Sequence, residues 1–451
     1  MSDAKKGGGG LPGLHFIHSL LHSGHEDAGW DATARPFLIA FVVLLFGFFL
    51  FAPEQSLRNF ELVIFLSPVW LPLLLVPHAV SRFIESRQAE NIAGYDYVLL
   101  ELRLPREMEK TPLAMELVLS SLHLSSGESN WYKRFWLGRV RPSFSLELVS
   151  LGGQVHFYLW TRESLRRSIE SFFYAQYPGL EIVETEDYSR LFDTLSHNND
   201  MFGTEYSHNK PDPLPIKTYV DFGLDKPGTK PEHQTDPLAQ LLEFIGSIGP
   251  KEQFWIQFII RMTRDPWKDE AKEMINEIRE STVKKGRYTD PATGKTVETE
   301  GFPNPTKGQI DQIAALERNV AKQGFDVGIR AIYTAPKDAY KGVMITHQLS
   351  LFKPFNSETY NSLGAQSLFS AKFGDYPWED PHGHHAHDEK VRITEYYRRR
   401  AFFYSPYVGP KVILSTEELA TLYHIPSSSV ATPGLNRIQS KSGGVPANLP
   451  V

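Results

Sequence analysis

The chain has 451 residues, with 47 Lys or Arg and 53 Asp or Glu side chains, which give a formal net charge of -6. This balance excludes a global attraction to nucleic acid, so any such contact would have to be local. The sequence contains no cysteine, which excludes disulfides, thiolate metal ligands and cysteine nucleophiles and fits a cytoplasmic domain.

Residues 1–34 predict a disordered or amphipathic N-terminus. Four consecutive glycines follow Lys6, and residues 14–25 then place apolar side chains on one arc of a helix. The opposite arc carries His15, His18, His22 and His25. These imidazoles predict either a metal-binding or pH-sensitive stripe, or the polar side of a helix in a membrane interface. We favour the membrane-interface helix.

Residues 35–84 predict a transmembrane helical hairpin. Pro36–Phe51 reads PFLIAFVVLLFGFFLF and contains no charged side chain, so with its flanks it approaches the ~20 residues that cross a bilayer. Leu62–Val76 is a second apolar run, whose two internal prolines predict a bent span or a re-entrant segment. We favour the span. The arginines outside the two runs then place both chain ends on the cytoplasmic side of the inner membrane.

Residues 95–187 predict a ferredoxin-like domain within an α+β chain. The apolar pattern changes period in the order strand, helix, strand, strand, helix, strand. The predicted elements are a strand at Tyr97–Leu104, a helix at Pro112–Leu122, a hairpin at Ser143–Trp160, a helix capped by Thr161 and a strand at Leu180–Val183. The hairpin turns at Gly152-Gly153, because glycine supplies the positive φ angles of a two-residue turn.

Residues 188–425 predict a second α+β domain with loop insertions, and residues 426–451 a flexible tail. The strand and helix order predicts a duplicated ferredoxin-like unit, although no residue-level self-similarity is visible. The predicted elements are a loop at Asp193–Pro213, strands at Pro215–Leu224, Phe254–Met262, Asp326–Thr334 and Arg399–Leu414, and helices at Asp236–Ile248, Asp265–Lys285, Lys307–Gln323, Asn356–Ala371 and after Thr416.

Two segments contain residue types that are typical of ligand sites. Thr289–Thr296 reads TDPATGKT, but Thr289 stands where a phosphate-binding loop needs glycine, and the segment lacks the flanking strand and helix. We expect a solvent-exposed turn there. The segment 375–388 carries acidic residues and a donor set that suits zinc or nickel, formed by His382, His384, His385 and His387. We expect this segment to be a solvated loop and keep its histidines as metal candidates.

Residues 130–141, NWYKRFWLGRVR, interleave aromatic and basic side chains before the predicted hairpin. This pattern fits a membrane surface, a nucleic-acid contact or packing within the domain. The candidate residues are Trp131, Lys133, Arg134, Trp136, Arg139 and Arg141. A second basic cluster, 398–400, predicts a solvated face, with DNA contact as the alternative. The sequence contains no Ser-His-Asp spacing signature, His-Glu-x-x-His or Gly-x-Ser-x-Gly, so we predict no enzyme, no catalytic residue and no cofactor.

Five phrases of the sequence together resemble a known family. They are VRPSFSLELVSLGGQVHFYLW (140–160), FFYAQYP (172–178), DPLPIKTYVDFGLD (212–225), TDPLAQLLEFIGSIGPKEQFWIQ (235–257) and ILSTEELATLYHIP (413–426). The set resembles the membrane-anchored, non-ATPase region of an uncharacterised family of type IV secretion- and conjugation-related proteins from uncultured bacteria. In longer members a motor ATPase follows the tail that here reads Thr432–Pro450.

The resemblance implies a non-enzymatic inner-membrane scaffold that holds a motor ATPase at the cytoplasmic face. Because no position of this sequence matches the ATP-site motifs, the ATPase would be a separate chain that docks here, or the sequence would be a truncated product. The implied partners are that ATPase chain, the lipid bilayer and further copies of the chain. The alternative is a membrane-tethered nucleic-acid-binding subunit of a DNA-transfer complex.

Overall fold

The computed structural model describes residue 61 and residues 64–438, apart from 126, 195, 197, 226–235, 290–295, 370–379, 381, 406, 429, 431, 433 and 436. The chain divides into two compact units, Met1–Arg82 and Phe83–Val451. The N-terminal histidine segment, the first hydrophobic run and the end of the tail lie outside the described residues.

Helix α4 (Ser67–Ala93) contains most of the second hydrophobic run. Its residues form one continuous helix that includes both prolines of the run, Pro68 and Pro72. Pro68 lies in its first turn, where a missing amide hydrogen costs no helical bond. No helix among the described residues is both long enough and apolar enough to cross a membrane. The predicted hairpin stays a prediction, because its first run is outside the described residues.

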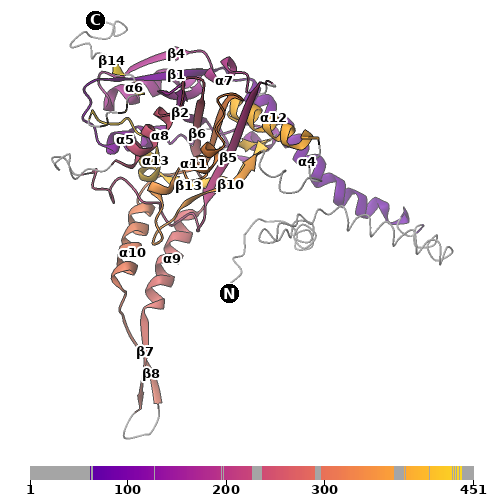
Figure 1. Cartoon of the computed structure of the whole chain (residues 1–451). Helices are drawn as coiled ribbons and strands as arrows, with labels where there is room; N and C mark the ends of the chain where they lie inside the picture. Colours follow the sequence, from indigo (N-terminus) through magenta and orange to yellow (C-terminus); the bar gives the residue numbers. More distant parts are fainter. Residues whose placement is uncertain are drawn as a thin grey trace, which may run out of the picture. The chain divides into compact units, whose positions relative to one another are not determined.

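The second unit has the mixed α+β class that the sequence predicted, and it contains one large, mainly antiparallel sheet (Figure 1). The strand order is β10-β5-β9-β6-β2-β3-β1, with β4 and β14 both beside β1 and β13 beside β9. The strands of this sheet are β1 (Tyr97–Pro105), β2 (Ser143–Leu151), β3 (Gln154–Arg162), β4 (Glu181–Thr185), β5 (Asn199–His208), β6 (Gln253–Met262), β9 (Gly324–Pro336), β10 (Leu363–Phe369), β13 (Val412–Ser415) and β14 (Arg437–Ile438).

The first half of the sheet has the predicted element order. Helix α5 (Pro112–Leu122) follows β1, helix α6 (Arg166–Gln176) follows β3, and the strands pair antiparallel in the order β4-β1-β3-β2. Gly152 and Gly153 form the tight turn, with φ angles of 61° and 88°. Thr161 is not a helix cap, because β3 continues through it and α6 begins only at Arg166.

The second half repeats this pairing with β5, β6, β9 and β10. They pair antiparallel in the order β10-β5-β9-β6, and helices α8 (Pro237–Gly246) and α11 (Val343–Leu349) follow β5 and β9. Two of these strands differ from the sequence prediction, since β5 lies in the predicted loop and β10 in a predicted helix. Conversely, the predicted strand Pro215–Leu224 has no regular structure over residues 215–218 and forms turns over residues 219–224. Pairing between β5 and β10 overrides the local pattern in both segments.

The two halves join edge to edge, because β2 pairs antiparallel with β6. At the middle of this junction Glu147 lies opposite Gln257, and the Gln257 amide donates a hydrogen bond of 2.9 Å to the Glu147 carboxylate. The sheet is therefore continuous across the boundary between the two predicted domains.

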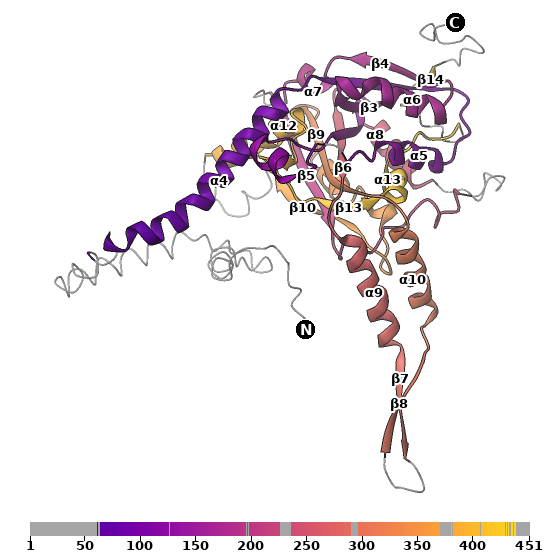
Figure 2. The same ribbon diagram turned by 180° about the vertical axis from the view of Figure 1, so that it is seen from behind.

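Where the first half has the Gly152-Gly153 turn, the second half inserts an arm between β6 and β9. The arm consists of α9 (Trp267–Ser281), β7 (Val283–Thr289), β8 (Thr296–Pro303) and α10 (Lys307–Val320). Figures 1 and 2 show α9 and α10 side by side, leading to the β7–β8 hairpin. Leu316 and Ile275 are buried together with Leu214 between these helices and the rest of the unit.

Helices cover both faces of the sheet. One face packs the large apolar core against α5, α6, α8, α11 and α13 (Thr416–Leu422). The other face carries a smaller core that includes Tyr188 of α7 (Tyr188–Leu191) and Ile393 and Tyr397 of α12 (His384–Arg398). The segment after α12 contains only the short strands β11 (Phe403–Tyr404) and β12 (Tyr407–Val408) before β13, and not one long strand.

Candidate functional site

An exposed group of aromatic and basic side chains lies directly before β2. We call it the aromatic–basic surface and define it as Phe83, Trp131, Tyr132, Lys133, Arg134, Phe135, Trp136 and Arg139. Trp131 is 71 % exposed and Trp136 57 % exposed, although large apolar side chains are normally buried. The backbone of Tyr132–Trp136 forms a single π-helical turn, an irregularity that is common at functional sites.

The aromatic–basic surface is built against the C-terminal part of α4. The Phe83 and Trp136 rings lie 5.7 Å apart, and the Arg87 Nε donates a 3.3 Å hydrogen bond to the Trp136 carbonyl. Gly138 has a φ angle of 60°, and a Cβ atom there would overlap the backbone carbonyl of Arg87. Only glycine fits this close approach, so the segment is fixed against the helix.

The surface has the chemistry of a binding site. The Arg134 guanidinium lies 5.3 Å from the centre of the Phe135 ring, while Lys133 donates to the Ser129 hydroxyl at 3.1 Å. Exposed rings beside exposed cations can insert between lipid head groups or stack on bases. Sequence reasoning missed Phe83, because this residue belongs to α4 and joins the other rings only through the fold.

Arg141 is not part of this surface, which corrects the sequence interpretation. It is 7 % exposed and its Nε lies 3.4 Å from the Glu128 carboxylate. Its guanidinium also donates to the Met262 carbonyl, at the point where the arm begins. Arg141 therefore joins the aromatic–basic segment to the arm. The other predicted residues, Trp131, Lys133, Arg134, Trp136 and Arg139, remain together near the exterior.

The second basic cluster is largely engaged within the protein. Arg398 donates to the Ser189 carbonyl at 3.0 Å, and only Arg399 is well exposed. Arg400 is buried, and its guanidinium binds the carboxylates of Glu147 and Asp187. This arrangement differs from the predicted solvated face, because carboxylates that are distant in sequence surround Arg400.

The predicted ligand segments adopt ordinary secondary structure where they are described. Residues 384–387 form the first turn of α12 and not a loop, and the rings of His382 and His384 are 5.8 Å apart. No group of three or more histidine, aspartate or glutamate side chains in the described part of the chain could hold a metal ion. Thr289 and Thr296 pair at the end of the β7–β8 hairpin, whereas a phosphate-binding loop would join a strand to a helix.

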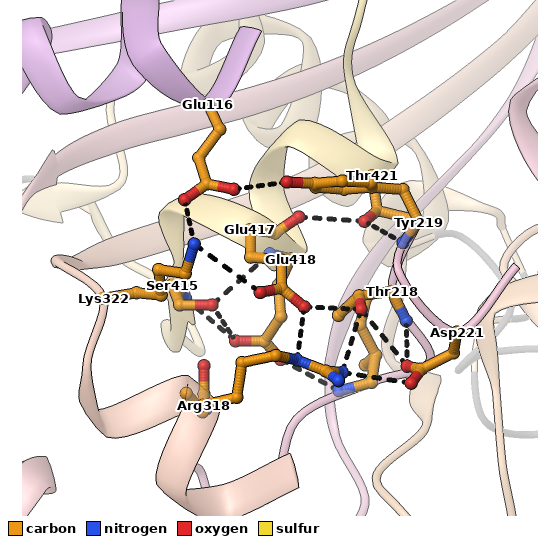
Figure 3. A network of polar contacts seen from close by, with 12 residues as sticks. Glu116, Thr218, Tyr219, Asp221, Arg318, Lys322, Ser415, Glu417, Glu418 and Thr421 are labelled. Atoms are coloured by element: carbon orange, nitrogen blue, oxygen red, sulfur yellow. Dashed lines mark hydrogen bonds and ion pairs between the residues drawn. The ribbon is translucent and has the colours of Figure 1, made fainter. Parts of the chain in front are cut away.

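A second polar feature, the arm-base network, connects α10 to the body of the unit (Figure 3). Glu417 of α13 lies 2.9 Å from the Arg318 guanidinium, and Lys322 lies 2.6 Å from the Glu116 carboxylate of α5. Arg318 also binds Asp221 at 3.0 Å. Both cations belong to the arm and its end, and the acids belong to the body. These ion pairs therefore fix the orientation of the arm at its base.

The acids of the network lie in a poorly hydrated environment. Burial raises the pKa of Glu417, although Thr218 and Arg318 oppose the rise. Burial also raises the pKa of Glu418 to about 7, against the lowering effect of His208 and of the hydrogen bonds from Ser415. Glu418 completes a capping box with Ser415 and accepts a 2.9 Å hydrogen bond from the Ile216 amide. Glu418 therefore caps the first turn of α13.

The fold and the site define a mixed α+β domain that presents an exposed aromatic–basic surface next to a helix. Residues 83–437 match the model of a domain of unknown function, DUF8128, and the chain belongs to this family. The match begins at the first residue of the second compact unit and ends within β14. No curated protein matches the chain.

Proposed function

We propose that the chain is a non-enzymatic, membrane-anchored scaffold whose aromatic–basic surface rests on the cytoplasmic face of the inner membrane. The observation that carries the proposal is the exposure of Trp131 and Trp136 beside Lys133, Arg134 and Arg139. Tryptophan is enriched at the head-group level of bilayers, and basic side chains near the surface each add about 1 kcal/mol of attraction to anionic lipids.

The position of this surface along the chain supports the same proposal. It packs against the part of α4 that begins at Phe83, and the N-terminal part of α4 contains residues 67–76 of the second apolar run. The two apolar runs would form the anchor, and both ends of the chain would lie in the cytoplasm. A chain anchored there would hold the aromatic–basic surface close to the bilayer.

The body of the scaffold consists, in this proposal, of two ferredoxin-like units fused through β2 and β6. Both halves use the same strand order, and a row of register partners crosses all six central strands. This row contains Glu101, Tyr158, Glu147, Gln257, Arg330 and Glu205. Duplicated sheets of this kind offer large surfaces for docking, and function lies in the surfaces and not in the fold.

The partner in this proposal is a motor ATPase of a type IV secretion- or conjugation-like machinery, supported only by the resemblance of the five sequence phrases. Three of those phrases form β2–β3, α8–β6 and β13–α13, which are buried elements. The resemblance therefore concerns the shared core, and the docking surface would lie elsewhere. The arm and further copies of the chain are candidates for contacts within such an assembly.

A tandem-affinity purification of the full chain from detergent-solubilised membranes, followed by mass spectrometry, tests the scaffold. We expect an ATPase or another secretion component to co-purify with the wild type. Recovery of the chain alone, at physiological salt and after cross-linking, would refute the scaffold role. Alkaline carbonate extraction tests the anchor separately: the chain should stay in the membrane pellet, and its release would contradict the hairpin.

The alternative function is a membrane-tethered nucleic-acid-binding subunit. The same interleaving of rings and cations favours it, because exposed aromatic side chains stack on single-stranded bases while basic side chains neutralise phosphates. The two functions differ in salt dependence. If three cations contact a single strand, the logarithm of the affinity should fall with the logarithm of the salt concentration with a slope of about -2. A pure scaffold gives no electrophoretic shift at any salt concentration.

A further inference from the structure

Five arginines are buried in the described part of the chain, and four of them pair with a carboxylate. The pairs are Arg141 with Glu128, Arg261 with Asp326, Arg330 with Glu205 and Arg400 with Glu147. Arg162, at the end of β3, is the exception. No described carboxylate lies within ion-pair distance of its guanidinium, although the residue is only 8 % exposed.

The partners of the Arg162 guanidinium are neutral groups, and one of them is the Tyr97 side chain. The Nε atom has no hydrogen-bond partner, and Nη2 reaches the Val140 carbonyl at 3.5 Å. The guanidinium also stacks on the Tyr95 ring, 3.8 Å from its centre. A buried ion is stabilised when a group of opposite charge lies beside it, and an anionic ligand in the cavity would supply that charge to Arg162.

Arg162 lines a cavity of about 590 Å³, a volume within the usual range of small-molecule sites. Tyr97 and Trp160 form one wall, with their rings stacked 4.1 Å apart at an angle of 6°. Ile92 of α4 adds an apolar contact surface. The cavity is lined by five arginines but only two acids, Glu184 and Asp187, and Asp187 is already bound to Arg400.

We propose that this cavity is a binding site for a phosphate group, held by the Arg162 guanidinium, with the remainder of the ligand against the Tyr97–Trp160 wall. A guanidinium offers a planar fork of donors that matches phosphate oxygens, and the second charge of a phosphate suits a cavity with an excess of cations. The phosphate belongs either to a soluble phosphate ester or to a phospholipid head group. A lipid is one of the two sources because α4 lines the cavity and also supports the aromatic–basic surface.

Calorimetric titration of the full chain in a non-ionic maltoside detergent tests this site, with glycerol 3-phosphate as the probe and sodium chloride at matched ionic strength as the blank. We expect saturable binding to the wild type and at least tenfold weaker binding to Arg162→Gln. Arg279→Gln is the matched control, since it removes an exposed arginine of α9 that lies outside the cavity lining, and it should bind within twofold of the wild type. Arg162→Lys should bind with intermediate affinity, because it keeps the charge and loses the fork.

The stability of the variants gives a second readout that does not depend on the ligand. Without ligand, Arg162→Gln should melt at the same temperature as the wild type or higher, because it removes an uncompensated buried charge. Loss of fold in Arg162→Gln would identify the guanidinium as a structural group and overturn the proposal. Absence of saturable phosphate binding to the wild type, or equal binding of acetate, would overturn it as well.

The two sources of phosphate are separated by competition. Nanodiscs that contain phosphatidylglycerol should displace the soluble ester if the ligand is a lipid head group, and they should leave its binding unchanged if the ligand is a free ester. Either result supports the phosphate site and identifies its ligand class. The site does not rest on the scaffold role, since calorimetry measures it without an ATPase or a secretion component.

Discussion

The substitution Arg400→Met tests whether a buried ion pair holds α12 against the junction of the two halves. The Arg400 Nε and Nη2 donate hydrogen bonds of 3.0 and 3.1 Å to the two oxygens of Glu147, and the guanidinium also binds Asp187. The side chains are 1 % exposed for Arg400 and 0 % exposed for Glu147. Glu147 belongs to strand β2, at the point where the first half of the sheet meets the second, and Arg400 follows α12.

Removal of the guanidinium would leave the Glu147 charge buried with neutral donors only. These donors are the Ser145 hydroxyl at 2.7 Å, the Tyr188 hydroxyl at 2.8 Å and the Gln257 amide. Breaking one side of a buried ion pair costs about 3–5 kcal/mol, and we expect the free energy of unfolding to fall by that amount. Methionine keeps the length of the side chain and meets the same backbone strain, because Arg400 has a φ angle of 49°.

Urea denaturation followed by tryptophan fluorescence measures this loss in the purified chain. The double variant Glu147→Gln, Arg400→Met removes both charges and should recover to within about 1–2 kcal/mol of the wild type. Arg399→Met is the matched control, since Arg399 is exposed, and it should change stability by less than about 0.5 kcal/mol. A loss below about 1 kcal/mol in the single variant would refute the claim that the pair is buried and coupled.

Three further predictions address the surface, its support and the arm base. In a fragment that comprises residues 83–451, replacement of Trp131 and Trp136 by serine should weaken binding to phosphatidylglycerol vesicles at least tenfold in a flotation assay. It should leave the melting temperature within about 2 °C of the wild-type fragment, because both rings are exposed. Gly138→Ala should destabilise the protein by about 2 kcal/mol in urea, since the new methyl group would overlap the Arg87 carbonyl and the backbone lies in the left-handed region. The raised pKa of Glu418, about 7 against 4.5 for an unperturbed side chain, means that the folded state binds its proton more tightly than the unfolded chain. Its contribution to stability is complete below pH 4.5 and decreases by about 3 kcal/mol as the pH rises through 7, and Glu418→Gln should flatten the stability profile over that range.

Each of these predictions has a contrary outcome. Unchanged flotation of the double tryptophan variant would assign the rings to a protein partner and not to lipid. A Gly138→Ala variant as stable as the wild type would show that the segment is not fixed against α4. A stability profile of Glu418→Gln that parallels the wild type between pH 4.5 and 7 would show that the buried carboxyl does not titrate there.

Local patterns predicted the elements whose signals are contained in a short stretch of sequence. The Gly152-Gly153 hairpin and helix α8 are examples, since the turn glycines have the required positive φ angles and Asp236 caps α8 by accepting from the Leu238 amide at 2.9 Å. The predicted order of strand, helix, strand, strand, helix and strand also gave the topology of the first half of the sheet, and α5 begins with the predicted proline.

The elements that were missed depend on partners far away in the sequence. Strand β5 resembles a polar loop because it contains Glu205, yet this carboxylate is buried and paired with Arg330 at 3.0 Å. Arg141 and Arg400 resemble surface cations for the same reason, since their carboxylate partners Asp326 and Glu147 are distant in the sequence. A sequence pattern cannot distinguish a solvated charge from a buried charge whose partner is more than a hundred residues away. Of the six candidate surface residues, Arg141 is buried and the other five lie near the exterior.

Because of the register of the central strands, the arm and the aromatic–basic surface lie at the same end of the sheet. Ser143, where β2 begins, pairs with Arg261 near the end of β6, so the segment before β2 and the arm after β6 leave the sheet at the same end. The Arg264 guanidinium, at the start of the arm, donates a 2.6 Å hydrogen bond to the Glu128 carbonyl, just before the aromatic–basic segment. If the surface rests on the bilayer, the base of the arm must lie beside the bilayer too. Helix α9, with 15 residues and about 1.5 Å of rise per residue, then extends about 22 Å from that base and carries the β7–β8 hairpin beyond its end.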